Sequence, residues 1–260
     1  MVGHMAIITA CAHEAALVRR CIRVQRQTTD AAGVLWQGTL CHQEVVLLQC
    51  GMGPERAAQA VLWLGQHYRL AGVLSVGFAA GLQAELARGE AILVTKILAP
   101  CDTPGTAAGA ADAGLRPDAR LAHIAAMAVA QAAVVSHTGT LLSTPTVVTP
   151  AAAKREMGRR SGALAVDMES YGVARAAAQS HLPCAVLRTI FDIASEPMTF
   201  PVTTCLTPAG SLQPWRLLGC LALHPGLVLQ LPHWWWTSHL AGSHLQRWLQ
   251  HFFLLLSQGA

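Results

Sequence analysis

The chain has 260 residues, of which 53% are hydrophobic and 12% are charged, and its formal net charge is +4. This length suits one large α/β domain or two small ones and is enough to bury a sizeable core. The basic residues are scattered, as in Arg19-Arg20 and Arg159-Arg160, whereas a nucleic-acid-binding surface normally has denser positive charge. We therefore expect no nucleic-acid partner.

The spacing of the cysteines and the length of the apolar stretches indicate the cellular compartment of the protein. Eight cysteines are spread along the chain without a C-x-x-C pair, which fits a reducing cytoplasm better than a disulfide framework. The first residues, MVGHM, lack the basic and apolar regions of a signal peptide. No uninterrupted apolar stretch reaches the roughly 18 residues of a membrane-spanning helix. We expect a cytoplasmic protein.

Apolar runs and alanine-rich stretches alternate along the chain. The runs rich in valine, isoleucine and leucine predict strands at Met5–Ala10, Val34–Leu40, Glu44–Gln49, Gly72–Val76, Ala91–Leu98, Val134–Leu142, Ala163–Val166 and Cys184–Ile190. The stretches between them predict helices at Ala12–Arg20, Pro54–Tyr68, Asp118–Gln131, Pro150–Gly158 and Glu169–His181, and a mobile loop at Pro100–Leu115. This order favours an α/β fold, a three-layer sandwich with a mixed, mostly parallel central sheet flanked by helices.

The end of the chain has a different character. Apolar residues recur at helical spacing at Leu245, Trp248, Leu249, Phe252 and Leu256, which predicts an amphipathic helix. Packing on the domain is the favoured explanation. A surface that meets lipid, formed with Trp234–Trp236, and an interface with a partner helix remain open.

Two glycine-containing turns follow predicted strands. In CGMGPERAAQA, Gly51 and Gly53 turn the chain before a helix that begins at Pro54, and such a helix N-terminus suits an anion. An ordinary strand–helix turn explains it equally well. In VGFAAGL, Gly77 lets the backbone approach a ligand, but the spacing fails the G-x-G-x-x-G pattern of dinucleotide sites, and a plain tight turn is as good an explanation.

Acids lie at three strand–helix junctions. Glu14 follows the first predicted strand, where a lone acid is usually a solvated helix residue. Asp192 ends the last predicted strand, at the edge where open α/β sheets place their ligands, and in isolation it is also explained as a helix cap. Asp167 and Glu169 lie two residues apart in AVDMES. One explanation is a helix cap with a first-turn acid. The other is a pair of carboxylates that bind a ribose, because each carboxylate oxygen can accept a hydrogen bond from a hydroxyl group.

The order of these motifs is more specific than any one of them. An acid after the first strand, G-x-G before a helix, V-G-x-A-x-G-L, V-x-M-E and R-x-x-x-D resemble the purine nucleoside phosphorylase and methylthioadenosine/adenosylhomocysteine nucleosidase superfamily over about residues 5–196. The resemblance implies a phosphorylase-like catalytic domain over residues 1–200 and a helical extension over residues 201–260. It also implies a homo-oligomer.

The same resemblance implies roles for individual residues. Met168 would pack on the sugar, and Glu169 would accept hydrogen bonds from the 2′- and 3′-hydroxyls. Asp192 would protonate N7 of the purine as the glycosidic bond breaks, because adenine leaves poorly as an anion. Glu14 would activate the attacking water in the hydrolytic branch, and Arg188 would structure the site.

Other positions complete the predicted substrate site and depart from the family pattern. The further substrate-binding candidates are Asp167, Phe78, Ala79, Gly81 and Phe191. Asp167 replaces the usual glutamate, Phe78 a small polar residue, and Phe191 a serine. The two phenylalanines favour a bulkier or more apolar substrate than a simple nucleoside.

The co-substrate is open between phosphate and water. Gly51, Gly53 and Arg56 offer a phosphate site at a helix N-terminus, whereas Glu14 favours water. No cofactor other than inorganic phosphate is expected. No metal is expected, because the chain has no H-E-x-x-H motif or paired Cys/His spacing.

The stretch Leu206–Pro232, together with ALAVDMES and VGFAAGL, resembles the hopanoid biosynthesis-associated phosphorylase-like proteins. This resemblance implies release of adenine from adenosylhopane, with peripheral contact of the tail at the inner membrane face. Two alternatives stay open. One is a soluble methylthioadenosine/adenosylhomocysteine nucleosidase, and the other is an inactive nucleoside-binding or membrane-scaffold protein.

Overall fold

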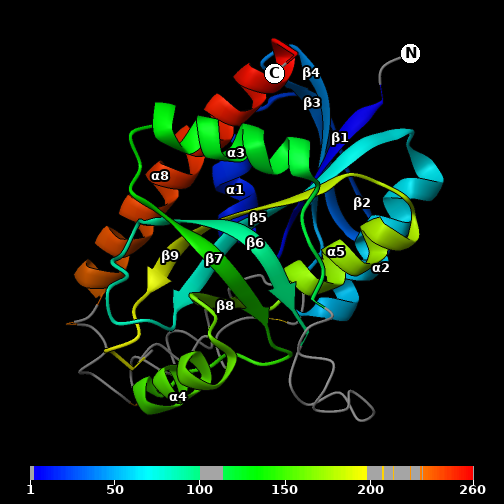
Figure 1. Cartoon of the computed structure of the whole chain (residues 1–260). Coiled ribbons are helices and arrows are strands. Elements are labelled where there is room, and N and C mark those ends of the chain that lie inside the picture. The colour runs from blue at the N-terminus through cyan, green and yellow to red at the C-terminus, as the bar shows by residue number, and fades with distance from the viewer. Residues whose placement is uncertain are drawn as a thin grey trace.

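The computed structural model shows a twisted sheet with helices on both faces (Figure 1). It describes residues 3–99, 114–197, 207, 213, 223, 229 and 231–259. The predicted loop at Pro100–Leu115 lies outside these residues except for its last two, and so does most of Leu206–Pro232.

The described elements follow the predicted order. The strands are β1 (His4–Thr9), β2 (Arg23–Asp30), β3 (Gly33–Leu40), β4 (Gln43–Gln49), β5 (Leu70–Gly81), β6 (Ala91–Leu98), β7 (Ser136–Ser143), β8 (Ala165–Asp167) and β9 (Cys184–Asp192). The helices are α1 (Ala12–Arg19), α2 (Pro54–His67), α3 (Ala119–Gln131), α4 (Ala151–Ser161), α5 (Ser170–Gln179) and α8 (Leu231–Ser257).

Strand β2 is the element that the sequence did not predict. Its residues, RVQRQTTD, are mostly exposed, and it pairs antiparallel with β3 from Arg23–Thr39 to Asp30–Gly33 at the edge of the sheet. A strand exposed on both faces needs no apolar alternation, so the hydrophobic pattern that marks the other strands is absent here.

The sheet is mixed, in the order β2-β3-β4-β1-β5-β8-β7-β6-β9, with an additional β5–β9 pairing. Strands β1, β4, β5 and β9 are joined by parallel pairings, whereas β2–β3, β3–β4, β5–β8 and β6–β9 are antiparallel. The β5–β9 pairing closes half of the sheet on itself. This mixed sheet with flanking helices confirms the predicted α/β fold class.

Alternation along β1 separates two cores. Met5 and Ile7 pack on the face covered by α1, α3 and α8, and Ala6 and Ile8 pack on the face covered by α2 and α5 (Figure 1). The sequence SVGFAAG therefore runs between two helical layers as the last part of β5, with its end at the edge where α4 lies.

The predicted amphipathic C-terminal helix is the second half of α8. Leu245, Trp248, Leu249 and Phe252 are buried in the core with α3, and the Trp248 indole nitrogen donates to the Ala125 carbonyl at 2.8 Å. The first half of α8 is different, because Trp235 and Trp236 are 70% and 53% exposed. None of the helices in the described ranges has both the length and the apolar character needed to cross a bilayer.

Candidate active site

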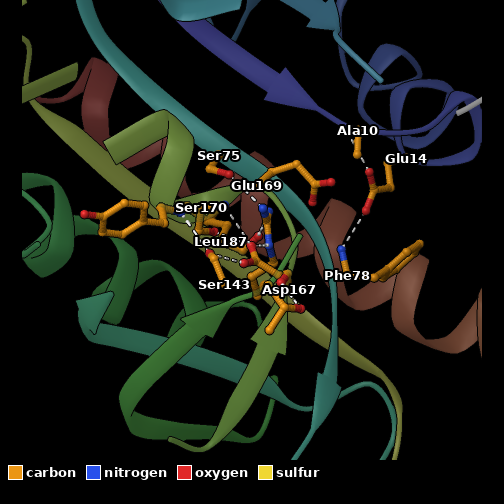
Figure 2. Close-up of polar contacts among 12 residues, drawn as sticks. Ala10, Glu14, Ser75, Phe78, Ser143, Asp167, Glu169, Ser170 and Leu187 are labelled. Carbon is orange, nitrogen blue, oxygen red and sulfur yellow. Dashed lines mark hydrogen bonds and ion pairs between the residues drawn. The ribbon is translucent and has the colours of Figure 1, made fainter. Parts of the chain in front are cut away.

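Strand register gathers the predicted acids at one edge of the sheet. Strands β1, β5 and β9 are parallel, so their carboxyl ends lie together, and Ala80 on β5 is paired with both Asp192 on β9 and Val166 on β8. The antiparallel β8 ends at Asp167, and Glu169 follows as the N-cap of α5. Figure 2 shows Glu14 on one segment and Asp167 and Glu169 on another, brought to the same region of the site.

Glu14 is buried and held by three backbone amides. Its Oε2 accepts hydrogen bonds from the amides of Ala10 at 3.0 Å and Cys11 at 3.2 Å, and its Oε1 accepts from the Phe78 amide at 2.8 Å (Figure 2). A Cβ at Gly77 would lie 2.3 Å from Glu14 Oε1. Gly77 is thus required because the Glu14 side chain packs against its backbone. The sequence interpretations were a ligand contact or a plain tight turn, and neither includes this contact.

Asp167 and Arg188 form a buried ion pair, with 2.8 Å between Arg188 Nε and Asp167 Oδ2. Arg188 Nη2 donates to Ser75 Oγ at 2.7 Å, so Arg188 joins β5 to β8. Asp167 also accepts from Ser143 Oγ at 2.6 Å and from both the amide and the hydroxyl of Ser170.

The expectation that Asp167 contacts the substrate is therefore not supported. Three protein hydrogen bonds go to Oδ2 and one to Oδ1, so most of the accepting capacity of this carboxylate is taken by donors of the protein itself. The shorter aspartate fixes Arg188 and the first turn of α5, and Glu169 is the member of the AVDMES pair that remains for a ligand. Ser75 and Ser143 were not among the predicted residues, because isolated serines in strands carry no distinctive pattern.

Glu169 is buried, and its Oε1 accepts a hydrogen bond from the Gly53 amide at 2.9 Å. Burial raises the pKa of Glu169 to about 8, and the charges of Asp167 and Glu14 act in the same direction. In Figure 2 the Glu169 carboxyl group lies on the Glu14 side of Asp167. Near neutral pH, the charged and the neutral forms of the Glu169 carboxyl group therefore differ little in free energy.

The predicted phosphate site is not supported either. The Gly51 amide donates to the Ala10 carbonyl at 3.0 Å, and the Gly53 amide donates to Glu169. Arg56 is exposed on α2. The two amides that would bind an anion are already bonded, and the acceptor at Gly53 is itself a carboxyl group that would repel phosphate when ionised.

Asp192 lies at the end of β9 with its carboxyl oxygen Oδ2 2.7 Å from Lys154 Nζ on α4. Burial raises the pKa of Asp192, and the Lys154 ammonium acts in the opposite direction. Lys154 was missed at the sequence level, because AAAKREMGRR has the composition of an ordinary solvated helix.

Aromatic rings connect the site to α8. The ring of Phe78 lies 5.4 Å from that of Phe191, which lies 6.0 Å from the Trp234 ring, and His13 stacks on Phe78 at 5.9 Å. Both phenylalanines are half-buried, as is Met168 beside Glu169.

Of the remaining predicted residues, Ala79 is buried in the core on the α2 and α5 face, and Gly81 lies close to the Asp192 backbone. Within the described ranges there is no group of three or more His, Cys, Asp and Glu side chains that could hold a metal ion.

The geometry defines an acid-rich site at the edge of a nucleosidase-like sheet, and sequence comparison agrees with this class. Residues 4–205 match the phosphorylase superfamily, and the chain belongs to this family. It is a glycosyl-bond-cleaving enzyme of the nucleosidase and phosphorylase type.

Two relatives are 5′-methylthioadenosine/S-adenosylhomocysteine nucleosidases. The one from Anoxybacillus flavithermus is 28% identical over 202 residues, covering 74% of this chain and 87% of the relative. The one from Halalkalibacterium halodurans is 27% identical over 196 residues, covering 72% and 84%. Both of these relatives are nucleosidases, and they do not confirm the hopanoid-associated subfamily.

The crystal structure of the same type of nucleosidase from Neisseria meningitidis, in complex with methylthio-immucillin-A, shares the fold. Its TM-score is 0.75 at 19% identity, with 97% of this chain and 99% of that chain covered. Since so little of either chain is left over, the match includes α8, and α8 belongs to the shared fold.

Proposed function

We propose that this chain hydrolyses the N-glycosidic bond of a 5′-substituted adenosine, such as methylthioadenosine or adenosylhomocysteine, and releases adenine. The observation that carries the proposal is that Glu14 and Glu169 lie close enough to interact beside β5, the strand whose Ala80 is paired with Asp192. The names of the similar proteins support the substrate class. Residues 1–200 would carry the catalytic groups, and α8, within residues 201–260, would complete the same fold.

Each acid has a distinct task in this reaction. Asp192 gives its proton to N7 of the purine, so that adenine leaves as a neutral base while positive charge develops on the ribose. Glu169 accepts hydrogen bonds from the ribose hydroxyls. Glu14 removes a proton from the water whose oxygen bonds to C1′, and the products are adenine and a free sugar.

Water is a better co-substrate for this site than phosphate. The amides of Gly51 and Gly53 are already engaged, and Arg188 is paired with Asp167. A phosphate dianion would have to approach Glu14 and Glu169, two carboxyl groups that form no ion pair within the described part of the chain. Adenine release should therefore be independent of added phosphate and should yield free 5-substituted ribose rather than its 1-phosphate.

The test is an assay of adenine release from methylthioadenosine, with and without phosphate, using the parent protein and Asp192→Asn. We expect the variant to lose about 100- to 10,000-fold in kcat, the usual contribution of a general acid. Asp30→Asn, on the exposed edge strand β2, is the matched control and should leave kcat unchanged. An inactive parent, or an Asp192→Asn variant as active as the parent, would refute the proposal.

A second candidate substrate is favoured by the aromatic row of His13, Phe78, Phe191 and Trp234. This row runs from beside Glu14 to the start of α8, where Trp235 is exposed, and it offers an apolar surface for a large 5′-substituent. Adenosylhopane fits that description, and the start of α8 would then contact the membrane face that holds such a lipid.

Competing turnover of adenosylhopane and methylthioadenosine separates the two candidates. If the apolar substrate is the natural one, kcat/KM should favour adenosylhopane, and Phe191→Ser should lower that preference while leaving methylthioadenosine turnover largely intact. Clear preference of the parent for methylthioadenosine would reject the lipid candidate and leave the first proposal standing.

A further inference from the structure

Lys154 on α4 has an exposed fraction of 0%, which is rare for a lysine and requires polar partners. Its Nζ donates to Asp192 Oδ2 at 2.7 Å, to the Ile193 carbonyl at 2.6 Å and to the Glu196 carbonyl at 2.5 Å. An ammonium has three protons, so its donors are all used, and Lys154 has none left for a phosphate or another ligand.

These contacts fix the turn that follows β9. Two of the three acceptors are backbone carbonyls within that turn, and the third is the carboxyl group at its start. From the other side, Arg88 forms an ion pair with the Glu196 carboxylate at 2.6 Å. The segment that carries Asp192 is thus anchored by cations on two separate elements.

The contact distinguishes the two oxygens of Asp192. Oδ2 is bonded to Lys154, and among the described residues Oδ1 has no hydrogen-bond partner. Holding Oδ2 restricts the rotation of the carboxyl group, so the other oxygen presents its proton over a narrower range of directions.

We propose that Lys154 is the positioning residue for Asp192, holding Oδ2 so that the proton on Oδ1 is directed at the leaving purine. The inference rests on the proposed function, and it assigns a role to a residue outside the family motifs.

The same contact gives an electrostatic signature. The charged groups around Asp192 are Lys154, Arg88 and Glu196, with His233 close to Glu196. The Lys154 ammonium favours the ionised carboxylate and counteracts the effect of burial on the pKa of Asp192. Removing that charge should raise the pKa further, so the general acid should keep its proton to higher pH.

The test compares Lys154→Met and Lys154→Gln with the parent over a pH series of adenine release from methylthioadenosine. Lys154→Met should lower kcat about 10- to 100-fold with a smaller change in KM, because the acid is misdirected while the ribose contacts remain. The alkaline limb of the pH–rate profile should move to higher pH. Lys154→Gln retains a donor without the charge, so it should recover part of kcat and keep the displaced limb.

The matched control is Arg159→Met on the same helix, whose side chain is 74% exposed and should change neither kcat nor the limb. If Lys154 had a purely structural role, its variants would unfold at a lower temperature and the alkaline limb of the pH–rate profile would not move. That result would overturn the inference. If Lys154→Met does not fold, the shift of the limb in Lys154→Gln decides the question.

A second readout does not depend on activity. Carboxyl carbon NMR of aspartate-labelled protein, with the Asp192 signal assigned through Asp192→Asn, follows the titration directly. The Asp192 signal should titrate at higher pH in Lys154→Met than in the parent, and an unchanged titration would refute the contact. If the parent releases no adenine, the proposed function fails, while this measurement still tests the link between Lys154 and Asp192.

Discussion

Substituting Gly77 tests the construction of the site at its tightest point. A Cβ in Gly77→Ala would lie 2.3 Å from Glu14 Oε1, 2.8 Å from Glu14 Cδ and 3.2 Å from an Arg188 guanidinium nitrogen. An acceptable carbon–oxygen contact is about 3.3 Å, so the Glu14 carboxyl group must retreat by about 1 Å. That movement breaks its 2.8 Å hydrogen bond with the Phe78 amide.

The effect on catalysis should exceed the effect on stability. Overpacking by one methyl group costs about 1–3 kcal/mol of unfolding free energy, which a chain of this size can tolerate. A displacement of about 1 Å in a catalytic group can lower the rate by about 100-fold. Because Glu14 is proposed to act on water rather than on the ribose, kcat should fall much more than KM rises.

Adenine release from methylthioadenosine measures kcat and KM, and thermal unfolding in the same buffer measures stability. Gly65→Ala is the matched control, because no atom lies within 4 Å of the added Cβ and the residue is in the interior of α2. It should stabilise the protein by about 0.5–1 kcal/mol without changing kcat. A folded Gly77→Ala variant with the kcat of the parent would refute the assignment of Glu14.

Three further predictions concern the buried charges and α8. Because the pKa of Glu169 is raised from 4.5 to about 8, folding stability should fall as pH rises through that interval, and urea unfolding of Glu169→Gln should show a weaker fall. A parent whose stability is flat across the interval would contradict this. Arg188→Met leaves the buried Asp167 carboxylate without its ion-pair partner and should lower the unfolding free energy in urea by about 3–5 kcal/mol. The double variant Arg188→Met/Asp167→Leu should recover part of that loss. Equal stability of the single and double variants would argue against the ion pair. Trp248→Ala removes a fully buried ring and its bond to Ala125 and should cost about 3–5 kcal/mol, measured in the same way, while Trp235→Ala should cost little. Similar losses for the two tryptophans would contradict the packing of α8.

Buried elements were predictable from the sequence because burial imposes a pattern. The runs that became β1, β4, β5 and β9 are continuous apolar segments, as expected for strands covered on both faces. The exposed strand β2 carries no such pattern, since its geometry comes from pairing with β3 rather than from the core. Its existence therefore depends on a partner that lies elsewhere in the chain.

The site was predictable in its acids but not in its contacts. The end of a strand in an α/β sheet indicates where ligands bind, which is why Asp192 could be singled out, whereas Glu14 and Glu169 were assigned roles through the family resemblance. The use of Asp167 depends on Ser143 from another strand, and the burial of Lys154 depends on where α4 lies against the end of β9. The contacts of Asp167 and the burial of Lys154 are consequences of tertiary packing, and the local sequence around each residue does not predict them.

The charge balance of the site explains how one set of acids can serve both folding and reaction. Arg188 compensates Asp167. Burial is the main cause of the raised pKa of Glu169, and the charges of Asp167 and Glu14 add to it. Among the described residues, Glu14 and Glu169 have no ion-pair partner. In the proposed reaction, positive charge develops on the ribose between these two carboxyl groups. The cation relieves their repulsion and favours the ionised form of Glu169, so the interaction is stronger in the transition state than in the free enzyme. The electrostatic cost carried by the folded protein is thus offset at the moment when the glycosidic bond breaks.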